Sequence, residues 1–338
     1  MIRRDLPQIP QIHVLYENPA WLPPLEEALT REGFRVRLVH VNEGLVDPSA
    51  PPPEGIWINR ISPSSHTRGH VHTVELARQL LYWLESHGRR VINGLGAFEL
   101  EMSKLRQDLV LRRHGIRTPR TVLAVGREHL LEAATTFDGP FITKHDQGGK
   151  GLGIRLFHNP RELERHLDGD GFDAGPGARM ILQQYIDAPE PFITRVEIVG
   201  GRFLFAMRSS TADGFELCPS DACNPMPSER NAPAGTEEEA ALEVCPAGPG
   251  LFSPSPVAED DPLVQRYIRL CNEEGIEIAG IEFVRDAWGH RYTYDINGTT
   301  NYNQTLGARI GVDGMGEVAR YVRRTATPGR RRRRRIAS

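Results

Sequence analysis

The sequence predicts an α/β protein of three units: an N-terminal open parallel α/β domain, a small central α+β module and a C-terminal domain with an antiparallel sheet. Three observations support this class. Strand-like and helix-like segments alternate over about the first hundred residues, which is typical of a parallel sheet with covering helices. A glycine-rich stretch at residues 148–153 lies between two strand-like segments. The pair Gly200 and Gly201 separates two β-rich runs and favours a hairpin.

The N-terminal unit, residues 1–101, contains the alternating segments. Strands are predicted at 12–16, 36–41 and 56–61, with a helix at 25–32 that ends at Gly33 and a proline-rich loop at 48–55. Residues 70–87 place apolar side chains at helical spacing and end at Gly88. A short strand and a turn follow at 91–96.

The central unit, residues 102–186, begins with a helix for which Ser103 is the expected N-cap and Gly115 the stop. Further elements of this unit are strands at 121–125, 141–146, 154–158 and 180–186 and helices at 128–136 and 162–167. The C-terminal unit, residues 187–326, is expected to contain the hairpin 192–208, a helix at 262–274, strands at 276–286 and 291–297 and a last helix at 314–324. Its stretch 209–262 is rich in Pro, Gly, Ser and acidic residues, and we expect a substrate-side loop or partial disorder there.

Composition and charge narrow the classes of function. Hydrophobic residues make up 39% of the chain and charged residues 25%, as in an ordinary globular protein, and the length of 338 residues favours two or three domains. The formal net charge of -3 indicates no bulk attraction to nucleic acid or to an anionic membrane. No apolar run approaches the ~20 residues that span a bilayer, and prolines interrupt any signal-like segment near the N-terminus. We therefore expect a cytoplasmic protein without a membrane partner.

For the cysteines and the C-terminal tail, the interpretations without a specific function are favoured. The four cysteines lack the spacing of common zinc sites and are expected to be free thiols: Cys218, Cys223, Cys245 and Cys271. Residues 327–338 contain six consecutive arginines. A solvated, disordered tail is favoured over nucleic-acid contact, because the rest of the chain has no basic bias. The sequence leaves the oligomeric state open and is compatible with a homo-oligomer.

The most informative segment is PFITKHDQGGKGLGIRLF, residues 140–157. One strand contains Lys144, the next begins at 154, and four glycines lie between them: Gly148, Gly149, Gly151 and Gly153. Glycines let backbone N–H groups approach phosphate oxygens, and the lysine supplies positive charge. The segment matches neither GxxxxGK[ST] nor a strand–GxGxxG–helix arrangement, and a glycine-rich hairpin without function is the alternative. A lysine without a partner in an apolar strand would be costly, which favours the functional interpretation.

The order of the surrounding elements makes this signal more specific. Lys104 on a helix precedes the Lys144 strand and its glycine loop, and the apolar strand 181–186 and two acidic strands follow. The acidic positions are Glu282 and Asp295, and Asn297 shares a strand face with Asp295 by the period of two. In this linked set the chain resembles the ATP-grasp superfamily, and within it the RimK-like branch of amino-acid ligases, from about residue 93 to 322 with the irregular stretch excepted. The resemblance implies an ATP-grasp fold with the central unit as its lid domain.

The resemblance also implies residue roles. Lys104 and Lys144 would hold the phosphates of ATP, under the glycine loop as a lid. Glu282, Asp295 and Asn297 would coordinate Mg²⁺, with two ions expected and Mn²⁺ as a substitute, since such ions prefer hard oxygen ligands. The hinge that pairs with the adenine edge would be Gln183, Gln184, Tyr185 and Ile186. The catalytic cations that face the transferred phosphoryl group and the acyl phosphate would be Lys144, Arg195 and Arg208.

Each of these residues also has a structural alternative. Lys104 can be an exposed helix lysine, Glu282 can lie on a solvated sheet face, and Arg195 can form a plain salt bridge. The chain departs from the family pattern at Ile193, where many relatives have an acidic residue, while Glu197 shares a strand face with Arg195. The first metal position is glutamate rather than the frequent aspartate. Neither departure argues against ATP binding, but both bear on the RimK-like assignment.

Two segments are candidates for substrate contacts. Residues 60–70 follow a strand of the N-terminal sheet, and open α/β sheets bind ligands at that edge. An arginine there can clamp a carboxylate, whereas a polar loop with a helix cap is the alternative. Residues 298–308 follow Asn297 directly and offer small polar donors. The candidate residues are Arg60, His66, Arg68, Thr299, Thr300 and Asn301.

The implied activity is that of an ATP-dependent carboxylate–amine ligase. A small-molecule carboxylate would attack ATP, and an amine from an amino acid or peptide would attack the acyl phosphate, which gives an amide, ADP and phosphate. No convincing Ser-His-Asp or Cys-His set is present, and positioning with electrostatic stabilisation suffices for this chemistry. Carboxylate–thiol ligation and phosphotransfer are alternatives on the same fold. A nucleotide-binding regulatory or nucleic-acid-binding protein that uses the arginine tail is an alternative of another class.

Overall fold

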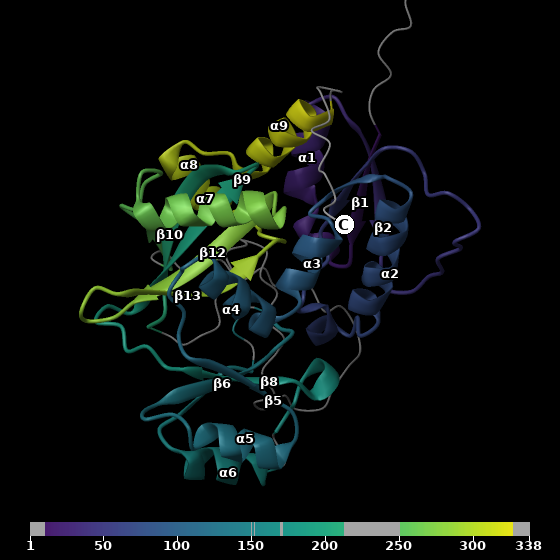
Figure 1. The fold of residues 1–338 in the computed structure, drawn as a ribbon. Helices are drawn as coiled ribbons and strands as arrows, with labels where there is room; N and C mark the ends of the chain where they lie inside the picture. Colours follow the sequence, from purple (N-terminus) through teal and green to yellow (C-terminus); the bar gives the residue numbers. More distant parts are fainter. Residues whose placement is uncertain (1–10, 150, 152, 170–171, 213–250, 327–338) are drawn as a thin grey trace, which may run out of the picture.

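The computed structural model describes residues 11–149, 151, 153–169, 172–212 and 251–326, and this part of the chain forms three β-sheets (Figure 1). The first is a parallel sheet with the order β2-β1-β3-β4. Its strands are β1 (Gln11–Tyr16), β2 (Arg35–His40), β3 (Ile56–Asn59) and β4 (Arg90–Ile92). The helical segments of this unit are η1 (Pro19–Trp21), α1 (Pro23–Arg31), η2 (Ser65–Arg68) and α2 (Thr73–Ser86). The alternation in the sequence therefore predicted the parallel sheet correctly.

The central sheet is antiparallel throughout, with the order β5-β8-β6-β7. It consists of β5 (Thr121–Ala124), β6 (Phe141–His145), β7 (Arg155–Phe157) and β8 (Met180–Gln184), and the short η3 (Pro176–Ala178) precedes β8. Helices α5 (Arg127–Ala134) and α6 (Pro160–Leu167) lie side by side on one face of this sheet (Figure 1). The glycine-rich segment connects β6 to β7, as the sequence predicted.

The C-terminal sheet is also antiparallel and has the order β11-β10-β9-β12-β13. Its strands are β9 (Phe192–Val199), β10 (Arg202–Ser210), β11 (Phe252–Pro254), β12 (Ile278–Arg285) and β13 (Arg291–Asn297). Gly200 and Gly201 form the hairpin turn between β9 and β10 with φ of 59° and 72°, a left-handed conformation that glycine adopts without strain. Helices α7 (Pro262–Glu274), α8 (Gln304–Ile310) and α9 (Gly314–Ala326) complete the unit.

The expectation for residues 209–262 needs a correction. Strand β10 continues to Ser210, and β11 lies within the stretch, where Phe252 pairs with Ser209. The sequence missed β11 because a three-residue strand has almost no periodicity of its own. The remaining part of that stretch, 213–250, lies outside the described residues, as do Cys218, Cys223, Cys245 and the arginine tail. Cys271 is a buried free thiol, as expected.

Two consecutive helices connect the parallel sheet to the central sheet. Helix α3 (Leu95–Glu101) was not predicted, and α4 (Lys104–Arg113) begins at the expected N-cap, where the Ser103 side chain accepts a hydrogen bond from Arg106 N. The Gln107 amide bonds both backbone groups of Ile296, with distances of 3.1 Å from Nε2 to O and 2.9 Å from Oε1 to N. These two bonds fix the first turn of α4 beside the end of β13.

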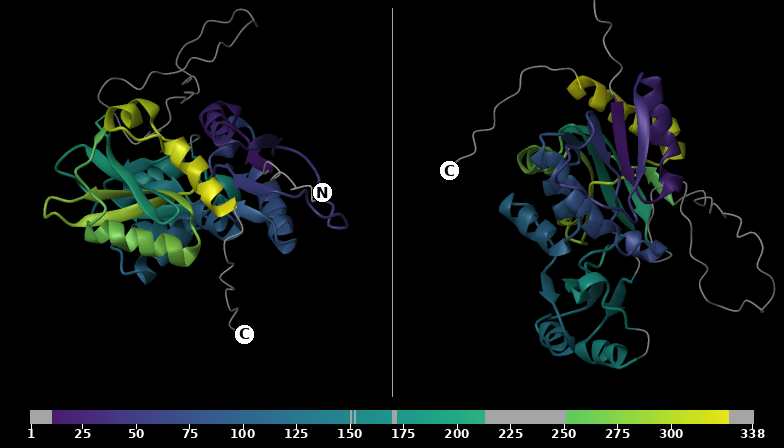
Figure 2. Two further views of the ribbon diagram at one scale, coloured as in Figure 1. Left: turned by 90° about the horizontal axis from the view of Figure 1, so that it is seen from above. Right: turned by 90° about the vertical axis from the view of Figure 1, so that its right-hand side faces the viewer.

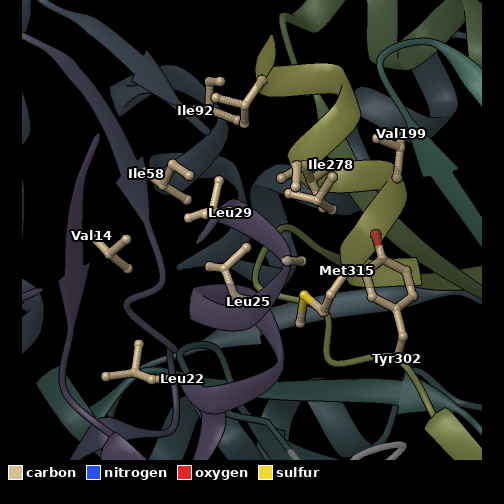
Figure 3. Close-up of a cluster of buried hydrophobic side chains, with 14 of the residues drawn as sticks. Val14, Leu22, Leu25, Leu29, Ile58, Ile92, Val199, Ile278, Tyr302 and Met315 are labelled. Atoms are coloured by element: carbon tan, nitrogen blue, oxygen red, sulfur yellow. The ribbon is translucent and has the colours of Figure 1, made fainter. Parts of the chain in front are cut away.

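The parallel sheet and the C-terminal sheet share one hydrophobic core (Figure 3). Val14, Leu25 and Leu29 of the N-terminal unit belong to the same buried cluster as Val199 and Met315 of the C-terminal unit. Helix α9 packs on α1, and Figure 2 shows from the side that the central sheet and its two helices project away from the rest. The central unit has a separate cluster around Phe141, Phe157 and Leu163. None of the helices in the described part of the chain has the length and apolar character needed to cross a bilayer.

Candidate active site

A single cleft brings together most of the residues that the sequence singled out. Its walls come from the central sheet, the C-terminal sheet, the start of α4 and a loop of the N-terminal unit at 62–64. Among the predicted site residues, the lining includes Lys104, Lys144, Gly148, Gly149, Gly151, Gln183, Gln184, Tyr185, Ile186, Arg195, Glu282, Asp295, Asn297, Thr299, Thr300 and Asn301. Segments that are almost 200 residues apart in the sequence therefore meet in one place.

Lys144 lies on β6 with its ammonium group buried in this cleft. Its Nζ donates to Gln183 Oε1 at 2.9 Å and lies 5.5 Å from the centre of the Tyr294 ring. Burial, followed by the positive charge of Lys104, lowers the pKa of Lys144 to about 8. Because the partner amide is neutral, this cation is available for an anionic ligand.

Lys104 is also buried, but it has a charged partner. Its Nζ forms an ion pair with Asp295 Oδ1. Asn297 Nδ2 lies 3.3 Å from the other oxygen of Asp295, so the two side chains share a strand face as predicted. Burial acts to raise the pKa of Asp295, but the charges of Lys104 and Lys144 outweigh it and hold this pKa below its usual value.

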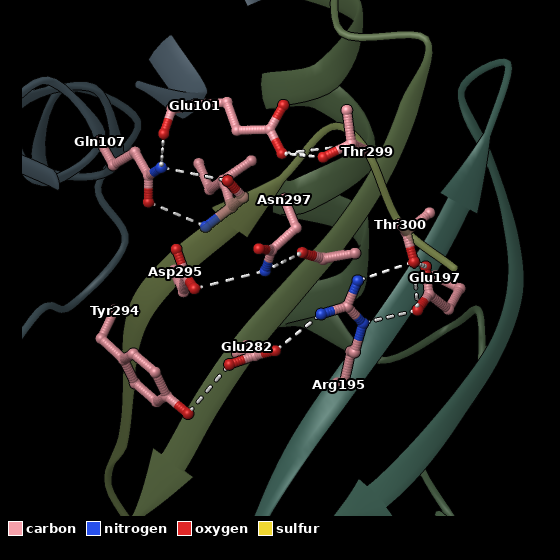
Figure 4. A network of polar contacts seen from close by, with 12 residues as sticks. Glu101, Gln107, Arg195, Glu197, Glu282, Tyr294, Asp295, Asn297, Thr299 and Thr300 are labelled. Carbon is pink, nitrogen blue, oxygen red and sulfur yellow. Dashed lines mark hydrogen bonds and ion pairs between the residues drawn. The ribbon is translucent and has the colours of Figure 1, made fainter. Parts of the chain in front are cut away.

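Arg195 forms the centre of a buried polar network (Figure 4). Its Nε donates to Glu197 at 2.6 Å, Nη1 to Glu282 at 2.7 Å and Nη2 to Thr300 Oγ1 at 2.7 Å. Burial alone would lower the pKa of Arg195, but the two carboxylates outweigh it and raise this pKa. Tyr294 donates to the second oxygen of Glu282 at 3.2 Å. The guanidinium group therefore connects a candidate metal ligand, Glu282, to the loop that begins at residue 299.

The hinge segment lines the cleft together with several apolar side chains. Gln183 belongs to β8 and pairs with strands on both sides, while Gln184 N and Tyr185 N donate to Arg120 O at 2.8 Å and Pro140 O at 3.0 Å. These apolar side chains are Pro119, Ile142, Ile154, Ile186, Phe192, Ile193 and Val284. A flat aromatic base can be enclosed between such faces.

The glycine loop follows β6 and lies against the N-terminal unit. A Cβ atom at Gly149 would lie 3.6 Å from Ser64 Cβ, and one at Gly153 would lie 3.4 Å from the His145 ring. Gly153 itself has a φ of 75° and does not belong to the cleft lining among the described residues. The backbone of this loop therefore lies next to the wall that contains Ser64.

Two buried carboxylates in this region were not among the predicted sites. Glu101, at the end of α3, lines the cleft and accepts hydrogen bonds from Thr299 N at 3.0 Å and Thr299 Oγ1 at 2.6 Å. Burial raises the pKa of Glu101. Glu197 accepts from Thr300 Oγ1 at 3.1 Å as well as from Arg195. No local sequence pattern distinguishes Glu101, because its partner Thr299 lies 198 residues further along the chain.

Besides Gly153, four predicted residues lie outside the cleft lining of the described chain. The guanidinium carbon of Arg208 lies 4.3 Å from the centre of the ring of Phe192, which lines the cleft. Arg68 pairs with the buried Glu17 and lies 4.9 Å from the centre of the Trp21 ring. His66 Nδ1 donates to Pro63 O at 3.2 Å, and the His66 ring lies 6.2 Å from that of His145. Arg60 lies behind the 299–301 loop, where it bonds Thr300 O at 2.9 Å.

The donor set at β12 and β13 fits a hard divalent cation. Glu282 and Asp295 are register partners on adjacent strands, and Asn297 follows on the same face. Two carboxylates and an amide oxygen suit Mg²⁺ that also binds phosphate. Within the described ranges, no group of three or more His, Cys, Asp and Glu side chains is arranged to hold a metal ion. The nearby cations Lys104 and Arg195 neutralise the two carboxylates in this structure.

Comparison with known proteins identifies the class. Residues 102–216 match the model of the RimK-like ATP-grasp domain. The chain resembles a crystal structure of a RimK domain ATP-grasp protein from Sphaerobacter thermophilus DSM 20745, with a TM-score of 0.64, 16% identity and coverage of 92% of this chain and 98% of that one. It also resembles D-alanine–D-alanine ligase from Bacillus anthracis, with a TM-score of 0.58, 14% identity and coverage of 93% and 99%. The protein therefore has the ATP-grasp fold, as the sequence predicted, and its residues 102–216 match a RimK-like ATP-grasp domain.

Curated relatives match over a shorter stretch. A protein of Teredinibacter turnerae (strain ATCC 39867 / T7901) named "Probable alpha-L-glutamate ligase" is 29% identical over 131 residues, which are 38% of this chain and 42% of the relative. A protein of the same name from Vibrio vulnificus is 26% identical over a stretch of the same length. The match thus spans about two fifths of the curated relatives.

Proposed function

We propose that this protein is an ATP-dependent carboxylate–amine ligase that forms an amide through an acyl phosphate. The observation that supports this best is the composition of the cleft: two lysines and Arg195 lie beside an oxygen-rich donor set, and the hinge segment and several apolar side chains line the same cleft. The names of the relatives and the fold agree with this activity.

In this proposal the nucleotide lies along the cleft between the central and C-terminal sheets. The base contacts the hinge at 183–186, and the phosphates lie at Lys144 and Lys104 under the glycine loop. Lys144 suits this role because its ammonium group is buried beside a neutral amide. An anion would give it the charge partner that Gln183 does not.

The chain's contribution to the reaction is then positioning and electrostatic stabilisation. Arg195 is buried and held by two carboxylates, so its charge has a fixed position when the phosphoryl group moves from ATP to the substrate carboxylate. Mg²⁺ bound at Glu282, Asp295 and Asn297 would neutralise phosphate charge, and Mn²⁺ would be a substitute. The glycine loop excludes water, which would otherwise hydrolyse the acyl phosphate.

We further propose an amino acid as one of the two substrates, with L-glutamate as the first candidate because the relatives are named glutamate ligases. The acceptor amine would come from an amino acid or a peptide. Carboxylate–thiol ligation and phosphotransfer to a hydroxyl use the same cleft and differ only in the product.

The experiment that tests this function is a screen for ADP release with Mg²⁺, ATP and pairs of amino acids, L-glutamate in each pair first. Mass spectrometry should find an amide together with ADP. A stable phosphorylated product would assign phosphotransfer instead, and a thioester would assign thiol ligation. Asp295→Asn should abolish ADP release while circular dichroism reports a folded protein, and full activity in this variant would remove the proposed site.

A further inference from the structure

Arg60 is a buried cation without a charged partner. The residue is 5% exposed, and within the described part of the chain its guanidinium forms no ion pair. Nη1 donates to Thr300 O at 2.9 Å, Nη2 donates to Asn301 Oδ1, and Nε is buried without a partner. Burial lowers the pKa of Arg60, and the charge of Glu101 offsets this effect only in part. Arg60 therefore marks a place where a further negative charge would be favourable.

The contact with Arg60 determines which end of the Asn301 amide faces the cleft. A guanidinium group has donors and no acceptor, so only the amide oxygen can face it. Asn301 lines the cleft, and its Nδ2 group has no partner among the described residues. The end of the amide that is left for a ligand is therefore the NH₂ group, a double donor.

The loop at 62–64, which lines the same cleft, also offers a donor. Ser62 and Ser64 both line the cleft, and their hydroxyl oxygens lie 2.9 Å apart. Each of these oxygens also accepts a hydrogen bond from another group. Ser64 N donates to Ser62 Oγ and Arg68 Nη1 donates to Ser64 Oγ, each at 3.2 Å. One hydroxyl hydrogen is used between the two serines, so the other hydrogen is left to donate, whichever direction the shared bond takes.

We propose that Asn301, Ser62 and Ser64 form a donor-only subsite for a substrate carboxylate that is not the one activated by ATP, with Arg60 behind it as the compensating charge. The other polar side chains of the 299–301 loop are already used, since Thr299 binds Glu101 and Thr300 binds Arg195 and Glu197. Arg60 is a positioning residue in this arrangement, because it acts on the ligand through Asn301. The proposal rests on the proposed ligase function and adds to it that one substrate has a second carboxylate, as an amino acid with an acidic side chain does.

Asn301→Asp separates this subsite from a purely structural role of the loop. The new carboxylate would form an ion pair with Arg60, so the melting temperature should stay the same or rise. In the cleft the same change replaces an NH₂ donor with an acceptor oxygen, which repels a carboxylate. With L-glutamate as the probe and Mg²⁺ with a non-hydrolysable ATP analogue already bound, calorimetry should find binding at least about tenfold weaker in Asn301→Asp. Affinity for the ATP analogue should not change.

Two controls complete the experiment. Asn272→Asp makes the same chemical change at an exposed position on α7 and should bind L-glutamate like the wild type. If Asn301→Asp does not fold, the double variant Ser62→Ala, Ser64→Ala tests the serine donors, and it should also weaken the binding of L-glutamate about tenfold.

The outcomes distinguish the subsite from the function. Unchanged L-glutamate affinity in Asn301→Asp, or an equal loss of affinity for the ATP analogue, would overturn the subsite. A wild-type protein that binds the ATP analogue but not L-glutamate would also overturn the subsite and leave the nucleotide site standing. A wild-type protein that binds no nucleotide would instead remove the proposed function.

Discussion

At the scale of single residues, the two cleft lysines should respond to the same mutation in opposite ways. Lys144 is buried beside a neutral amide, and the nearby carboxylates offset the cost of its burial only in part, so Lys144→Met removes a charge that is costly to bury. We expect an equal or higher melting temperature and ATP binding weakened about tenfold or more. Calorimetry with a non-hydrolysable ATP analogue and thermal denaturation measure the two effects.

Lys104→Met is the matched control, because it leaves Asp295 buried without its ion-pair partner. Breaking a buried pair costs about 3–5 kcal/mol, so this variant should have a clearly lower melting temperature. Equal melting temperatures for the two variants would contradict the assignment of Lys144 as the uncompensated cation.

The pKa of Lys144 predicts a pH dependence of ATP use. This pKa is about 8 in the ligand-free protein, and the uncharged amine that forms above it binds phosphate poorly. The value of kcat/KM for ATP reports the free protein and should fall as the pH rises through about 8, whereas kcat should fall only at higher pH, because bound phosphates stabilise the ammonium ion. Steady-state kinetics between pH 6 and 10 separate the two profiles. A kcat/KM that stays flat to pH 10 would mean that Lys144 does not bind the phosphates.

At the scale of elements, the pairing of β9 with β12 holds Arg195 in place. Glu282 is the register partner of Arg195, and Gly280 is that of Glu197. A Cβ atom at Gly280 would overlap the guanidinium group of Arg195. Gly280→Ala should therefore displace Arg195 from both carboxylates, lower the melting temperature and reduce ADP release at least about tenfold.

Gly96→Ala is the matched control for this prediction. Gly96 lies in α3 with no atom within 4 Å of the new methyl group, so alanine should be neutral or stabilise by up to about 1 kcal/mol. Gly280→Ala and Gly96→Ala should therefore differ both in melting temperature, measured by thermal denaturation, and in ADP release. A Gly280→Ala variant with normal activity would show that the position of Arg195 is not critical.

The same elements show what local sequence can and cannot predict. Regular periodicity in the sequence was sufficient to predict α2, the β9–β10 hairpin and the position of Asp295 and Asn297 on one face of β13. Helix α3 was missed because Gly94 provides no side-chain cap and the helix has only 7 residues. The contacts of Arg60 with Thr300 and Asn301 could not be predicted, since these partners are 240 and 241 residues away and no pattern in the sequence connects them.

At the scale of the whole molecule, the shared core joins the N-terminal and C-terminal units. Leu25 and Leu29 of α1 are buried in the same cluster as Val318 and Val322 of α9. Asn93 adds polar contacts across this boundary, because its side chain bonds Ile278 O at 2.8 Å and Gly298 O at 2.9 Å. The loop at 62–64 and the loop at 299–301 are thereby fixed on either side of one cleft, so the N-terminal unit takes part in the proposed site and is more than an appended domain.

The arginine tail distinguishes the ligase from the alternative that binds nucleic acid. The described cleft is lined by residues between Trp21 and Asn301, and the last described helix ends at Ala326. A chain that ends at Pro328 keeps all of these residues, so ADP release and the melting temperature should match those of the full chain. Replacing the six arginines with glutamine at full length separates charge from length. Filter binding with RNA and DNA should accompany the ADP assay, because basic segments can bind polyanions without any role in turnover. Loss of ADP release in both variants would favour a nucleic-acid-dependent activity over the ligase proposed for the cleft.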